Sequence, residues 1–173
     1  PTQTPQRGRT LVAQTLGVRH PERLLSLTLV DTIHHTPLEA RAMWADRIGQ
    51  VEAHGMGGTV ESTLNRWLTA PFREPHPEIV ERIRKMLLET PVRGYVGVAQ
   101  AIEAFDLARA ISRIHCPTLV VVGDKDEGSP VSIAEAIARE IHGSRLEVLP
   151  DAAHLSFIEQ PERFHAMFDA FLG

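Results

Sequence analysis

The sequence is organised around one stretch, Pro117-Thr118-Leu119-Val120-Val121-Val122-Gly123, and the acidic loop that follows it, residues 124–130. The stretch is short, apolar and rich in β-branched side chains, which is typical of a strand buried on both faces in a parallel sheet. Glycine ends the strand, and the polar loop leads into a helical pattern over residues 131–141. Strand, polar loop and helix in this order predict an α/β fold, in which functional side chains gather beyond the carboxyl ends of the strands.

Two further strands are expected, one on each side of this stretch in the sequence. Residues 24–30 form an apolar run that ends at Asp31, and residues 145–149 form a second run followed by the loop 150–156. A helical pattern over residues 11–18 stops at His20-Pro21, because proline disfavours a helical residue before it, and a closing helix covers residues 161–172. We therefore expect three strands of a parallel sheet with flanking helices.

The middle of the chain, residues 37–110, is helical and contains no convincing strand. Apolar residues recur at helical spacing within residues 38–51, 59–68, 79–87 and 94–105, and glycine or proline separates these segments. A helical insert between strands predicts a cap on the sheet. We accordingly divide the chain into a polar tail or linker (1–10), a core in two parts (11–36 and 111–173) and a helical cap (37–110).

Composition narrows the range of functions. The 173 residues carry a formal net charge of −4, which gives no electrostatic case for binding nucleic acid or an anionic membrane. No apolar stretch is long enough to span a bilayer. Cys116 is the single cysteine, so an intrachain disulfide is excluded and a cytoplasmic location is the default expectation. His34-His35 is interpreted as a loop pair under the cap, since no carboxylate or thiol joins it at ligand spacing, and we expect no metal and no cofactor.

Two loop residues form the candidate catalytic pair. Asp126 follows one strand and His154 follows the next, 28 residues later in the sequence. A carboxylate on one loop can accept the Nδ1 proton of a histidine on the neighbouring loop, which fixes the tautomer and stabilises imidazolium. Asp124 and, more weakly, Asp31 are alternative acids. The non-catalytic interpretations are that Asp126 caps the following helix and that His154 is a solvated loop residue.

Several motifs resemble those of the α/β-hydrolases. They are His20-Pro21-Glu22-Arg23, Leu29-Val30-Asp31-Thr32, Pro117-Thr118-Leu119-Val120-Val121, the loop from Gly123 to Pro130, Ala153-His154 and Gln160-Pro161-Glu162. In the cap, Arg66-Trp67, the run 86–91 and Gly94-Tyr95 are most similar to the 3-oxoadipate enol-lactonases, cytoplasmic enzymes that open an enol-lactone ring in aromatic catabolism. The resemblance covers about residues 11–173.

This resemblance implies a fold and a site. The fold would be part of the α/β-hydrolase fold, with the three parallel strands side by side at the end of the family's sheet, flanking helices and an inserted helical cap. Asp126 would be the acid and His154 the base of a Ser-Asp-His triad, and the substrate would be a small ester or lactone. Trp44 and Trp67, on the cap helices, are candidates for lining the substrate pocket; packing within the cap is the alternative interpretation.

The nucleophile departs from the family pattern. The family's serine lies in a G-x-S-x-G turn before the helix that begins here near Leu11, and the alignment puts Arg7 at its position. No G-x-S-x-G occurs in the chain, and a guanidinium that stays protonated cannot act as a nucleophile. We therefore expect a hydrolase chain without its nucleophile and N-terminal strands, inactive on its own. The alternatives are a non-catalytic module that binds a small carboxylate or a protein, and a hydrolase completed in trans.

The edge of the sheet gives a further expectation. Without preceding strands, the run 24–30 would expose its backbone edge, and an apolar edge is a template for pairing. We expect this edge to be covered by a second copy of the chain, by residues 1–10, or by an N-terminal complement.

Overall fold

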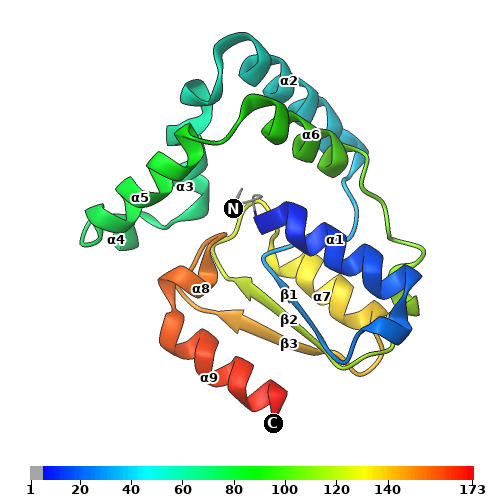
Figure 1. Ribbon diagram of the computed structural model, residues 1–173. Coiled ribbons are helices and arrows are strands. Elements are labelled where there is room, and N and C mark those ends of the chain that lie inside the picture. Colours follow the sequence, from blue (N-terminus) through cyan, green and yellow to red (C-terminus); the bar gives the residue numbers. More distant parts are fainter. Residues whose placement is uncertain (1–5) are drawn as a thin grey trace.

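The computed structural model describes residues 6–173 and contains a three-stranded parallel sheet (Figure 1). The strands are β1 (Leu27–Val30), β2 (Thr118–Gly123) and β3 (Arg145–Leu149), in the order β1-β2-β3. Leu27 lies opposite Thr118, and Leu119 lies opposite Arg145. The expected side-by-side arrangement is confirmed. Because all three strands are parallel, their carboxyl ends meet at one edge of the sheet.

Helices cover both faces of the sheet. On one face, α1 (Gln6–Arg19) and α7 (Val131–Glu140) pack on strand residues such as Leu29 and Val120, together with the short helix η3 (Ile111–Arg113). On the other face lies α9 (Pro161–Leu172) (Figure 1). Its phenylalanines pack against Leu119 and Val121. Every residue of β2 is buried, which accounts for its continuous apolar sequence.

The insert between β1 and β2 is a helical cap over the carboxyl edge of the sheet (Figure 1). Its elements are α2 (Leu38–His54), η2 (Met56–Thr59), α3 (Val60–Trp67), α4 (Ala70–Arg73), α5 (Pro77–Leu88) and α6 (Val92–Glu103). Backbone hydrogen bonds connect the two chain segments that join cap and core. Thr36 N–H donates to Phe105 O and Leu107 N–H donates to His34 O, both at 2.8 Å. In the described part of the chain, no helix is long and apolar enough to cross a membrane.

Several elements differ from the sequence-based expectations. Helix α1 begins at Gln6, so residues 6–10 are helical rather than a polar tail, because Leu11 and Gln14 are buried and fix the helix on the core. Residues 1–5 lie outside the described part. Strand β1 begins at Leu27 rather than residue 24, since Leu27 N–H meets Pro117 O where β2 starts and Leu25 is 94% exposed. The short helices α4 and α8 (Ser156–Glu159) have no counterpart among the expected helices.

Candidate active site

The loops after β2 and β3 bring Asp126 and His154 together. Asp126 Oδ2 lies 2.8 Å from His154 Nδ1, and both side chains are almost completely buried. The other oxygen of Asp126 accepts hydrogen bonds from Gly128 N–H (2.8 Å) and Ser129 N–H (3.1 Å). These two bonds fix the carboxylate, so Oδ2 is directed at the imidazole.

Backbone contacts explain why the two loops lie so close. Lys125 N–H donates to Ala152 O at 2.9 Å, which joins the acid loop to the histidine loop. A Cβ atom on Gly123 would lie 2.2 Å from Ala152 O and 2.4 Å from Ala153 O. Glycine at the end of β2 therefore permits the histidine loop to cross the strand end at this distance. Asp151, at the start of that loop, has a φ of 55°, a conformation that Asp adopts more readily than most residues.

The two alternative acids have other partners. Asp124 pairs with Lys125 and accepts from Ala152 N–H, at the surface. Asp31 is buried, and its φ is 47°. Its Oδ1 accepts from Gly123 N–H (3.0 Å), and its Oδ2 accepts from Ser156 N–H (3.1 Å) and Ser156 Oγ–H (2.7 Å). Among the three acids, Asp126 is the one in contact with the His154 ring.

Burial dominates the electrostatics of Asp31. Desolvation raises the pKa of this carboxyl from 3.8 to about 8; the hydrogen bonds from Ser156 and Gly123 oppose the rise, and the nearby Asp126 adds to it. The raised pKa extends the pH range over which the Asp31 carboxyl holds its proton in the folded protein. The 2.7 Å contact with Ser156 Oγ persists in either state, because a protonated carboxyl can donate to the hydroxyl.

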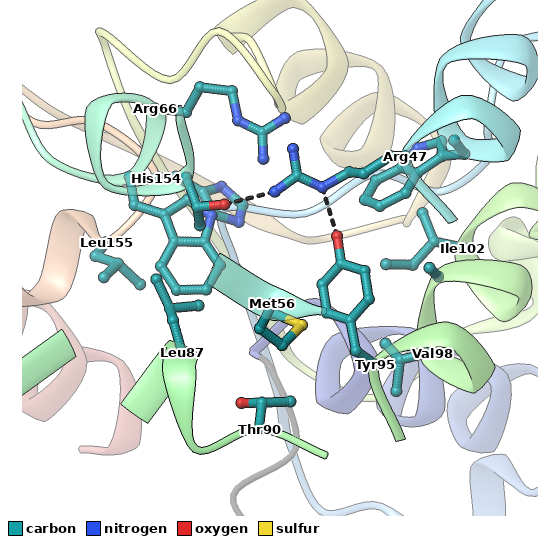
Figure 2. Close-up of a pocket in the computed structure, with 14 residues that line it drawn as sticks. Arg47, Met56, Arg66, Leu87, Thr90, Tyr95, Val98, Ile102, His154 and Leu155 are labelled. Atoms are coloured by element: carbon teal, nitrogen blue, oxygen red, sulfur yellow. Dashed lines mark hydrogen bonds between the residues drawn. The ribbon is translucent and has the colours of Figure 1, made fainter. Parts of the chain in front are cut away.

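A pocket under the cap reaches His154 (Figure 2). Trp44 and Trp67 both line it: Trp44 is also buried in the α2/α6 packing, and the Trp67 ring lies 6.1 Å from the His154 ring. Arg47 lines the same pocket and donates to Tyr95 Oη and Thr63 Oγ, both at 2.5 Å (Figure 2). These residues come from α2, α3 and α6, so tertiary packing assembles the pocket.

Sequence reasoning missed the cationic groups of this pocket. Figure 2 shows the Arg47 and Arg66 side chains directed toward the same region near His154, and both line the cavity. Arg47 lies in α2 at helical spacing from Trp44, which was the available signal. Glu159, also missed, lies in α8 and accepts hydrogen bonds from both Ala153 and Thr69. The side chain of Arg7, the residue expected from the sequence at the position of the family's serine, lies outside the described residues.

Comparison with known proteins assigns the family. A family model described as the alpha/beta hydrolase fold matches residues 10–161, so the chain belongs to the α/β-hydrolase family. The chain is 30% identical over 162 residues to 3-oxoadipate enol-lactonase 1 of Acinetobacter baylyi, covering 94% of this chain and 60% of that protein. The relationship expected from the sequence motifs is confirmed.

Solved structures of relatives support the same assignment. The enol-lactonase of Burkholderia xenovorans LB400 superposes with a TM-score of 0.91 at 29% identity, covering 96% of this chain and 63% of that one. A thermophilic esterase from Thermogutta terrifontis, with malate bound, superposes with a TM-score of 0.86 at 33% identity, covering 94% of this chain and 61% of that one. The chain thus spans about three fifths of the length of these relatives.

Proposed function

We propose that this chain supplies the acid and the base for hydrolysis of a small carboxylic ester or lactone. The observation that carries the proposal is the buried Asp126–His154 pair, 2.8 Å apart, at the end of a pocket under the cap. With its proton on Nδ1 and directed to Asp126, the imidazole presents Nε2 as a base. His154 would take a proton from an attacking hydroxyl and return it to the leaving alkoxide, while Asp126 stabilises the imidazolium.

The attacking hydroxyl would come from outside these 173 residues. No G-x-S-x-G turn occurs in the sequence, and two serines on the loops of the pair have described hydrogen-bond acceptors: Ser129 Oγ donates to Asp31 O (3.3 Å) and Ser156 Oγ to the Asp31 carboxyl. In the described sheet, β1 pairs with β2 alone. We propose that its other edge binds the segment that carries the nucleophile, from the same protein or in trans, with a second copy as the alternative occupant.

The pocket favours a substrate that carries a negative charge. Its walls are mainly apolar, Arg47 contributes a cation, and the described partners of that cation are the neutral hydroxyls of Tyr95 and Thr63. A buried or half-buried cation with neutral partners is stabilised by an anionic ligand. The relatives named enol-lactonase and the malate-bound esterase fit a carboxylated lactone or ester. We propose such a substrate, from aromatic catabolism in the cytoplasm.

Hydrolysis by two preparations tests this function. The chain alone is compared with a fusion in which the part of the Acinetobacter enol-lactonase that precedes the matched region replaces residues 1–10. We expect no hydrolysis of p-nitrophenyl acetate or dihydrocoumarin by the chain alone and measurable turnover by the fusion. Asp126→Asn and His154→Gln in the fusion should each reduce turnover by about 10³-fold or more.

Two results would contradict the proposal. One is a folded fusion, verified by circular dichroism, that hydrolyses neither probe. The other is turnover that survives His154→Gln. Binding of small carboxylates by the pocket without any hydrolysis by the fusion would instead support a non-catalytic binding module, the second candidate.

A further inference from the structure

The histidine segment, residues 153–156, is held through its backbone by groups from three other parts of the molecule. Ala153 N–H donates to Glu159 Oε2 at 2.5 Å, Leu155 N–H donates to Trp67 O at 3.0 Å, and Ser156 N–H donates to Asp31 Oδ2 at 3.1 Å. Two of these three acceptors are buried carboxyl groups. Placing a carboxyl in the interior costs free energy unless hydrogen bonds compensate it, so the arrangement calls for a physical explanation.

Asp31 joins the histidine segment to the acid loop. Its carboxyl accepts from Ser156, two residues after His154, and from Gly123, three residues before Asp126. Its backbone oxygen also accepts from Ser129 Oγ, three residues after Asp126. Asp31 therefore contacts the acid loop on both sides of the catalytic acid and the histidine segment on one side.

Glu159 joins the histidine segment to the cap. Its Oε2 accepts from Ala153 N–H, the residue before His154. Its Oε1 accepts from Thr69 N–H (2.8 Å) and Thr69 Oγ–H (2.7 Å), two residues after Trp67. The Glu159 carboxyl therefore accepts hydrogen bonds both from Thr69, which follows Trp67 in the wall of the pocket, and from Ala153, the residue before His154.

We propose that Asp31 and Glu159 are positioning residues that fix His154 from two sides, Asp31 against the acid loop and Glu159 against the cap. This inference rests on the proposed function, because it assigns the two carboxyls to the Asp126–His154 pair. The roles differ: Asp31 sets the alignment of the imidazole with Asp126, whereas Glu159 also sets the alignment of the imidazole with the pocket.

Backbone hydrogen bonds that involve neither carboxyl should hold the two loops on the sheet when one carboxyl is removed. Lys125 N–H to Ala152 O (2.9 Å) and Asp124 N–H to Leu149 O (3.0 Å) join the strand ends without either carboxyl. Removal of one carboxyl should therefore loosen residues 153–156 and leave the sheet paired.

Amide hydrogen exchange by NMR on the full chain compares Asp31→Ala, Asp31→Asn, Glu159→Ala, Glu159→Gln and the exposed control Glu162→Gln. We expect exchange at Ser156 to rise about tenfold or more in Asp31→Ala, and exchange at Ala153 and Thr69 to rise similarly in Glu159→Ala. The Asn and Gln variants keep one acceptor oxygen and should recover part of the protection. The amides of Thr118 to Val122 in β2 should be unchanged in all five variants, whereas Gly123 N–H, which donates to Asp31 Oδ1, should exchange faster in Asp31→Ala.

The His154 Nδ1–H proton signal is the readout that a merely structural role would not move. It should weaken or disappear in both alanine variants at unchanged protection of Thr118 to Val122, and it should persist in Glu162→Gln. Acceleration of exchange throughout β2, or loosened loops with an unchanged Nδ1–H signal, would overturn the inference. Neither readout involves turnover, so failure here and failure of the hydrolysis test on the fusion are distinguishable.

Discussion

Replacement of Asp31 by asparagine should change how the stability of the protein depends on pH. Burial raises the pKa of Asp31 from 3.8 to about 8, against the opposing hydrogen bonds of Ser156 and Gly123. Between these two values the folded state binds a proton that the unfolded state has released. The stability due to this group is therefore fully present below about pH 4 and is lost as the pH rises toward 8.

The magnitude follows from proton linkage. One fully linked proton changes the free energy of unfolding by about 1.4 kcal/mol per pH unit. From pH 5 to pH 7 the wild-type protein should thus lose about 3 kcal/mol relative to Asp31→Asn, which does not titrate. Asp31 is 1% exposed, so solvent screening does not reduce this value substantially.

Urea unfolding at pH 5, 6 and 7 measures the effect. The quantity to compare is the difference in the free energy of unfolding between wild type and Asp31→Asn, because the contributions of all other groups cancel in it. Ser156→Ala keeps the carboxyl and removes a bond that lowers its pKa, so it should retain the slope. A difference that is constant with pH, or one that moves in favour of the wild type as the pH rises, would refute the reasoning.

Three further predictions concern the end of β2, the segment around His34 that joins cap and core, and the pocket. Gly123→Ala should lower the free energy of unfolding by about 3 kcal/mol in chemical denaturation, because the new Cβ meets backbone atoms, whereas Gly49→Ala, with nothing within 4 Å, should raise it by about 0.5 kcal/mol. Burial and the neighbouring His35 lower the pKa of His34 below 6.5, so the contribution of this residue to stability should be lost as the pH falls below 6.5. The melting temperature of His34→Gln should therefore fall less steeply with decreasing pH than that of the wild type. Arg47→Met should weaken binding of malate about tenfold or more in calorimetry, with Arg47→Lys weakened less; equal affinities in all three proteins would contradict the proposed anion site.

Local sequence determined the helices and strands whose own residues show a clear apolar pattern and clear end signals. The spans of β2, β3 and α9 agree with the expectations for residues 118–123, 145–149 and 161–172. These segments have continuous apolar runs or a strong helical face, with glycine or proline at a boundary. The same logic placed Asp126 and His154 on loops after adjacent strands, because the carboxyl ends of parallel strands meet at one edge.

Tertiary structure alone decided the contacts that have no local signal. The N-terminal half of the expected run 24–30 is not strand, since pairing with β2 can begin only where β2 begins. Arg47, Tyr95 and Thr63 come from three helices that sequence spacing does not relate. Asp31 became a buried group that joins two loops, because its partners Gly123 and Ser156 lie 92 and 125 residues away. Periodicity reports which side of an element is buried; it does not report which distant polar groups meet there.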